Sequence, residues 1–103
     1  MALKSYKELI VWQKAVDLVT QIYECTKFFP KDEIYGLRQQ LRRAAVSIPS
    51  NIAEGQCRNT SKDFLHFLAM AHGSLGELDT QVLISQRLAY LGDEQANEMF
   101  DRI

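Results

Sequence analysis

The sequence predicts an all-α protein, an up-down-up-down antiparallel four-helix bundle with a short fourth helix. Apolar residues recur at helical spacing along nearly the whole chain, and no window shows the sustained alternation that is typical of a strand. Helix-breaking residues are few, because the 103 residues include only two prolines and five glycines. The breaks leave four stretches, and we expect helices at about 6–28, 33–54, 61–90 and 94–103 in a single domain, 1–103.

The first helix is expected to begin after Ser5, because Ser5-Tyr6-Lys7-Glu8 has the form of a capping box. Pro30 disfavours helical geometry at the residue before it, so the helix should end near Phe28. Its apolar line comprises Leu9, Trp12, Val16, Val19 and Tyr23, flanked by Ala15, Leu18 and Ile22.

The second helix should begin near Asp32 or Glu33. Pro49 lies inside it, removes a backbone donor and predicts a kink, and Gly55 is a natural stop. Its apolar line comprises Ile34, Leu37, Leu41, Ala44, Ile48 and Ile52.

Thr60 or Ser61 can cap the third helix, and Asp93, after Gly92, can cap the fourth. Two mid-helix glycines, Gly73 and Gly76, are locally unfavourable, so we expect another helix backbone to approach closely there. The apolar line of the third helix comprises Phe64, Leu68, Ala71, Leu75, Leu78 and Val82. The apolar face of the fourth comprises Ala96, Met99, Phe100 and Ile103.

Basic residues gather near the middle of a nearly neutral chain. The net charge is −1 and the pI is about 6.1, which argues against a generally basic nucleic-acid binder. Residues 38–62 nevertheless carry +4, so the rest of the chain carries −5. This cluster is a candidate surface for phosphate or for an acidic protein, and the alternative is a solvated face. Its cations are Arg38, Arg42, Arg43, Arg58 and Lys62.

Four polar residues of the second helix, Arg43, Ser47, Asn51 and Glu54, are spaced so that they share one face. Either they form a solvated stripe with one ion pair, or they form a polar seam inside the bundle or at a subunit contact. We expect Ser47, Asn51 and Glu54 to be a structural motif. Asn51 and Glu54 lie just past the Pro49 kink, where the helix has lost a backbone bond, and can bond to the following loop or to a partner helix. Removal of Glu54 should then cost about 1–3 kcal/mol if a buried polar group is left unpaired.

The titratable residues show no catalytic or metal-binding spacing. Cys25 and Cys57 form no C-x-x-C pair, and His66 and His72 do not share a helix face. We therefore predict no enzyme, no cofactor and no metal.

An enzymatic alternative would use Glu54 and Arg43 in the bundle interior, and it would need a buried polar pocket. Nothing at the N-terminus resembles a signal peptide, and no apolar run is long enough to span a membrane. We therefore expect a cytoplasmic protein with reduced cysteines.

Several segments resemble one protein family. The run 42–55, RRAAVSIPSNIAEG, closely resembles the signature of the bacterial four-helix-bundle proteins encoded in 23S rRNA intervening sequences. Further similar segments are 9–15, Phe29-Pro30, 35–37, Phe64, 67–68 and 73–78. The resemblance implies a ring-like homo-oligomer, typically a pentamer, and no known catalysis. A related branch, the accessory variability proteins of diversity-generating retroelements, binds nucleic acid and a reverse transcriptase through a strongly basic surface, and the −1 charge of this chain departs from that branch.

These observations lead to one main functional hypothesis: a homo-oligomeric binding or accessory module that associates with RNA or with a nucleic-acid-processing protein. The alternative is a purely structural oligomer, or an adaptor for a protein partner, with no nucleic-acid role.

Overall fold

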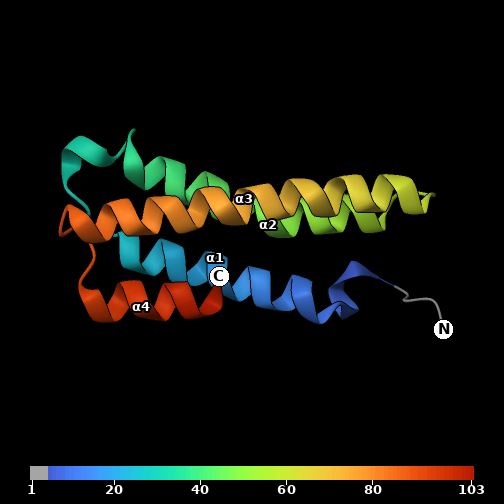
Figure 1. The fold of residues 1–103 in the computed structure, drawn as a ribbon, viewed down its shortest axis with the longest axis horizontal. Coiled ribbons are helices and arrows are strands. Elements are labelled where there is room, and N and C mark those ends of the chain that lie inside the picture. Colours follow the sequence, from blue (N-terminus) through green and yellow to red (C-terminus); the bar gives the residue numbers. More distant parts are fainter. Residues whose placement is uncertain (1–4) are drawn as a thin grey trace.

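Four α-helices lie side by side in a computed structural model of the chain, which describes residues 5–103 (Figure 1). The helices are α1 (Ile10–Thr26), α2 (Leu37–Gln56), α3 (Ser61–Arg87) and α4 (Asp93–Arg102). Short 3₁₀ turns, η1 (Tyr6–Glu8) and η2 (Lys31–Glu33), precede α1 and α2. No strand occurs within residues 5–103, so the predicted all-α fold is confirmed.

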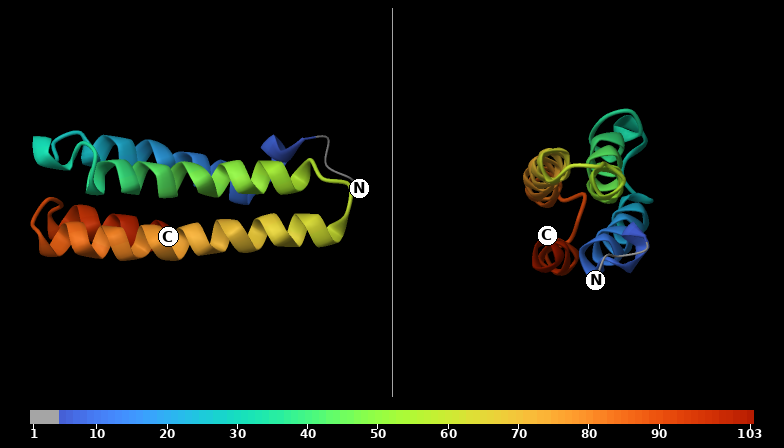
Figure 2. Two further views of the ribbon diagram at one scale, coloured as in Figure 1. Left: turned by 90° about the horizontal axis from the view of Figure 1, so that it is seen from above. Right: turned by 90° about the vertical axis from the view of Figure 1, so that its right-hand side faces the viewer.

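Each helix runs antiparallel to the one before it, and the end-on view places the four helices at the corners of a square (Figure 2). α2 packs against α1 and α3, and α4 packs against α3 and α1. α4 has 10 residues whereas α3 has 27, so α4 covers only part of the bundle's length. Beyond the end of α4, the other three helices continue without it (Figure 1). This is the predicted bundle with a short fourth helix.

Side-chain caps explain where two of the helical segments begin. Thr60 Oγ1 accepts a hydrogen bond from the backbone N–H of Asp63 at 3.1 Å, and α3 follows directly. Ser5 Oγ likewise accepts from the N–H of Lys7 at 3.1 Å, but this contact caps only η1. Because Leu9 has an extended backbone, α1 begins at Ile10 rather than at residue 6.

The second helix begins at Leu37 rather than at residue 33, because the preceding segment forms η2. Glu33 then acts as a cap from outside the helix: its Oε1 accepts from the N–H of Leu37 at 3.0 Å. At the other end, α2 continues through Pro49 to Gln56. Gly55 is therefore a buried residue within the helix and not the stop that the sequence suggested.

The third helix ends at Arg87, earlier than the predicted residue 90. Ala89 has a φ of 61°, and this left-handed residue turns the chain out of the helix. The N–H groups of Tyr90 and Leu91 both donate to the carbonyl oxygen of Ser85, at 2.9 and 3.3 Å. The Tyr90 ring then packs against Phe29, with 5.4 Å between ring centroids.

The core follows the predicted apolar lines in α2, α3 and α4 more closely than in α1. In α1 the buried line comprises Ala15, Leu18, Ile22 and Thr26, three of which the sequence placed only at the flank. Tyr23 instead turns outward, and Ile34, expected to be in the second helix, lies exposed in the turn before it. Both residues belong to the same end of the bundle, where they line a hollow in the surface.

Candidate functional site

The five basic residues predicted as one patch lie at two ends of the bundle. Arg38, Arg42 and Arg43 belong to the first half of α2. Arg58 lies in the connection between α2 and α3, and Lys62 lies in the first turn of α3. Because an α-helix rises 1.5 Å per residue, Arg43 and Arg58 are about 20 Å apart along the axis. The structure therefore brings three of the five together and leaves two elsewhere.

The three arginines surround a surface hollow of about 550 Å³, which we call the arginine recess. It lies beside the first half of α2, the end of α1 and the turn that joins these two helices. Nine residues line it: Tyr23, Ile34, Tyr35, Arg38, Gln39, Arg42, Arg43, Val46 and Ser47.

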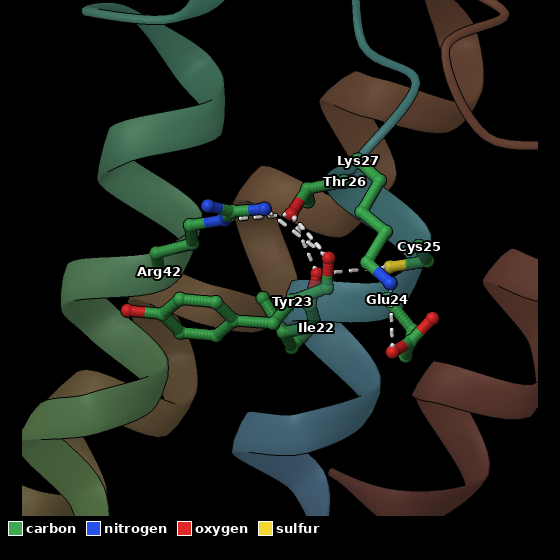
Figure 3. Close-up of polar contacts among 7 residues, drawn as sticks. All are labelled: Ile22, Tyr23, Glu24, Cys25, Thr26, Lys27 and Arg42. Atoms are coloured by element: carbon green, nitrogen blue, oxygen red, sulfur yellow. Dashed lines mark hydrogen bonds and ion pairs between the residues drawn. The ribbon is translucent and has the colours of Figure 1, made fainter.

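Arg42 is held in place by the end of α1 (Figure 3). Its Nε donates to Thr26 Oγ1 at 2.9 Å, and its Nη2 donates to the carbonyl oxygen of Tyr23 at 3.2 Å. Its guanidinium also lies over the Tyr23 ring, 4.3 Å from the ring centroid. A cation is favourable at this position, because the last carbonyl groups of a helix carry partial negative charge. The Arg42 side chain is thus held in one position on the lining of the recess.

Arg38 and Arg43 are less constrained. Arg38 is half-buried and Arg43 is exposed, and neither side chain makes a hydrogen bond or an ion pair within residues 5–103. Arg38 and Arg42 are four residues apart on one helix, a spacing at which like charges repel. No acidic side chain is among the nine residues that line the recess. Three positive charges and no carboxylate on the lining make this a site that favours an anion.

An aromatic side chain completes the recess. Tyr35 is 88% exposed, and it lies with Ile34 in the turn between η2 and α2. Glu33, at the start of this turn, is bonded both to α2 and to Tyr90 Oη, at 3.0 Å in each case. Sequence patterns do not indicate this aromatic contribution, because helical spacing places Ile34 in a core line and assigns Tyr35 no functional role.

The predicted polar line of α2 is divided in the structure. Ser47 Oγ is hydrogen-bonded to Ser74 Oγ on α3, and Asn51 Nδ2 donates to the carbonyl oxygen of Ser47 at 2.8 Å. Glu54 is exposed and forms an ion pair with Arg58. Arg43 lines the recess. Ser47 therefore joins α2 to α3, Asn51 bonds back to the backbone of α2, and Glu54 belongs to the surface.

Arg58 and Lys62 lie in different surroundings from the recess. Arg58 pairs with Glu54, and its guanidinium lies over the Phe67 ring, 5.0 Å from the centroid. Both partners of the ion pair are about half exposed, with side-chain exposures of 46% and 51%. Because one of its charges is already matched by a carboxylate, this end of the bundle offers less free positive charge than the recess.

The cysteines lie apart, on α1 and after α2, and Cys57 is exposed rather than packed in the core. Burial raises the pKa of the Cys25 thiol to about 11, which keeps it protonated at neutral pH. Glu54, the acid of the enzymatic alternative, lies outside the recess. Within residues 5–103 no group of three or more metal-binding side chains occurs.

The fold and the recess define a helical-bundle protein with a cationic, aromatic-lined hollow on its surface. The chain belongs to the 23S rRNA-intervening sequence protein family, whose model matches residues 7–103. The family expected from the run 42–55 is thus confirmed. A search of curated proteins returned no match to the chain. Among the helices of residues 5–103, none combines the length and the apolar character needed to cross a bilayer.

Proposed function

We propose that this protein is a non-catalytic, self-associating RNA-binding module of the cytoplasm, and that RNA phosphates bind at the arginine recess. The observation that carries the proposal is the recess itself: three arginines and no carboxylate line it, although the chain as a whole is slightly acidic. Arginine suits phosphate, because its planar guanidinium donates paired hydrogen bonds. The main alternative is an acidic protein partner, since a carboxylate cluster would satisfy the same charges.

A titration of a labelled RNA oligonucleotide, followed by fluorescence anisotropy across a salt series, tests this proposal. Binding through phosphates must weaken as salt rises, because counterions are released. For single strands the slope of log K against log salt is about −0.7 per phosphate neutralised, so Arg38→Ala with Arg43→Ala should make the slope shallower by about 1.4. Arg42 is left intact in this variant, because it also holds the end of α1.

The matched control is Arg58→Ala with Lys62→Ala, which removes the same charge from the other end of the bundle. We expect this control to change affinity much less than the recess variant. Equal losses in the two variants would argue for net charge alone and against the recess. No RNA binding at low salt would refute the RNA proposal and leave the protein-partner adaptor.

Self-association is the second part of the proposal, and the outward face of α3 supports it. Six residues at helical spacing are exposed and uncharged along nearly the whole helix: Leu65, Ala69, Gly73, Gly76, Thr80 and Leu83. The side of each glycine is open, since a Cβ added at Gly73 or Gly76 would meet nothing within 4 Å. Among residues 5–103, therefore, the expected close approach of a helix to these glycines does not occur.

An uncharged, smooth helix face of this kind suits a second copy of the chain. Such a homo-oligomer, a pentamer in the form that the family resemblance implies, would repeat the arginine recess with its symmetry. Several weak phosphate contacts then act on one RNA, which raises the overall affinity without any new contact.

A further inference from the structure

We propose that the arginine recess holds an unpaired nucleotide, whose base stacks on Tyr35 while its phosphates contact Arg38 and Arg43. This inference rests on the proposed function, and it specifies the kind of RNA: single strands, loops or ends, and not a continuous duplex.

The first support is the exposure of Tyr35. Its side chain is 88% exposed, although it lies between apolar Ile34 and the arginines of α2. Phosphate binding does not require an aromatic ring, whereas an unpaired base stacks on one. In a duplex the bases are already stacked on one another and their faces are closed. An exposed ring beside free cations therefore favours a ligand that offers both a phosphate and an open base.

The second support is the division of labour among the arginines. Arg42 is bonded to Thr26 and to the Tyr23 carbonyl group, and it covers the Tyr23 ring. One face of the Tyr23 ring is therefore already covered, and Tyr35, which is far more exposed, is the tyrosine of the recess more open to a base. Arg38 and Arg43 make no polar contact within residues 5–103, so their guanidinium groups are available to phosphate.

The third support is the size and the chemistry of the hollow. Its volume of about 550 Å³ lies within the range of sites for small organic ligands, which is about 300–1,000 Å³. Ile34 and Val46 supply apolar surface for the face of a base. The exposed amide of Gln39 both donates and accepts, so it suits the edge of any base. The recess is thus suited to a nucleotide without a strong preference for its sequence.

The experiment compares one labelled RNA strand, free and annealed to its complement as a blunt duplex, with the full chain and with variants of it. We expect the free strand to bind more tightly than the duplex. Tyr35→Ala should weaken binding of the free strand by roughly 5- to 100-fold, since stacking contributes about 1–3 kcal/mol per base. Tyr35→Phe should bind within about 2-fold of the parent, because the ring that stacks is retained.

Phe28 provides the matched control. It is 92% exposed and lies just after α1, but it is not among the residues that line the recess. Phe28→Ala should leave RNA binding unchanged, whereas Tyr35→Ala should weaken it. Because Tyr35 is exposed, both variants should melt at the temperature of the parent, which circular dichroism checks.

The outcomes separate this inference from the proposed function. If free strand and duplex bind equally and Tyr35→Ala binds like the parent, the stacking inference is overturned and phosphate binding at the recess stands. If Tyr35→Ala weakens the free strand and the duplex by the same factor, the inference is likewise overturned. If neither the free strand nor the duplex binds at low salt, both the proposed function and the stacking inference are refuted.

Discussion

At the scale of single residues, Glu33 joins two separate parts of the chain. Its Oε1 accepts from the N–H of Leu37 and so caps α2, while its Oε2 accepts from Tyr90 Oη, in the connection between α3 and α4. The turn that carries Tyr35 is therefore held at both ends. This connection links the shape of the recess to the stability of the whole end of the bundle.

The bond between Tyr90 and Glu33 predicts a dependence of stability on alkaline pH. Because the phenol donates to a carboxylate, the hydrogen bond raises the pKa of Tyr90 above its ordinary value, and burial and the nearby charges of Glu33 and Asp32 act in the same direction. The folded state thus holds this proton more tightly than the unfolded chain does. The stabilisation is fully present below about pH 10 and is lost as pH rises through the raised pKa.

Tyr90→Phe should therefore lower the melting temperature at neutral pH. The gap in melting temperature between the variant and the parent should narrow as the buffer becomes strongly alkaline. Thermal melts in a series of buffers measure this gap. Glu33→Gln, which keeps the shape and one acceptor oxygen but replaces the other oxygen with NH2 and removes the charge, should abolish most of the pH dependence. A gap that stays constant from neutral to alkaline pH would show that the Tyr90 proton does not matter.

At the scale of helices, α2 and α3 approach each other closely at Gly55. A Cβ added there would lie 2.9 Å from Phe67 Cβ and 3.3 Å from the carbonyl oxygen of Phe64. Neither atom is the end of a flexible side chain, so a methyl group would push the helices apart. The close approach expected at Gly73 and Gly76 thus occurs at another glycine and between another pair of surfaces.

Gly55→Ala should destabilise the protein by about 1–3 kcal/mol, as overpacking of a tight contact does. Helix propensity alone predicts the opposite sign, because alanine is favoured over glycine by about 1 kcal/mol inside a helix. Urea denaturation followed by circular dichroism distinguishes the two. An increase in the denaturation midpoint would mean that the helices separate at little cost.

The polar residues of α2 should differ in their effect on stability. Ser47 is partly buried and bonded to Ser74, so Ser47→Ala leaves a hydroxyl without its partner at the α2–α3 contact and should cost about 1 kcal/mol. The exposed pair of Glu54 and Arg58 should contribute less than about 1 kcal/mol. Glu54→Ala is therefore expected to melt close to the parent, in contrast to the loss expected from sequence. The same denaturation series compares the two variants, and a larger loss in Glu54→Ala would reverse their assigned roles.

Local patterns predicted the helices, but they did not predict contacts between distant residues. The Thr60 cap involves a neighbour three positions away, so the sequence shows it directly. The Glu33–Tyr90 bond joins residues 57 positions apart, so no local pattern indicates it. Glu33 also caps α2 from outside the helix, and α2 begins at Leu37 instead of at residue 33. Apolar periodicity could not show that Tyr23 is exposed, because it identifies a stripe and not the width that the neighbouring helices cover.

The recess was only partly predictable for the same reason. Arg38 and Arg58 were predicted to form one patch because both belong to residues 38–62. The length of α2 separates them, so they lie towards opposite ends of the bundle. Arg38, Arg42 and Arg43 remain together because they lie within two turns of one helix. Tyr35 joins them only because the turn before α2 returns towards the helix, which no spacing rule describes.

At the scale of the whole molecule, the length of α4 and the character of α3 bear on assembly. A small hollow of about 160 Å³ lies where α4 ends, lined by apolar residues of α1, α2 and α3 and by the last residues described. Exposed apolar side chains also flank the smooth outward face: Met70 and Ile84 on α3, and Leu88 just after the helix ends. These side chains add apolar surface to the uncharged outward face of α3, which suits an interface with a second copy of the chain.

The outward face of α3 predicts that one substitution will abolish assembly and leave the fold intact. Gly76 lies in the middle of that face, and a Cβ added there meets no described residue within 4 Å, so Gly76→Glu should fold as the parent does. At a contact between two copies, however, the same carboxylate would be buried without a partner, which is strongly unfavourable. Light scattering at micromolar concentration should therefore show an oligomer for the parent and a monomer for Gly76→Glu. Ser50→Glu, which adds the same charge to an exposed position of α2, is the control and should remain oligomeric. A monomeric parent would refute self-association, and an oligomeric Gly76→Glu would place the interface on another face of the bundle.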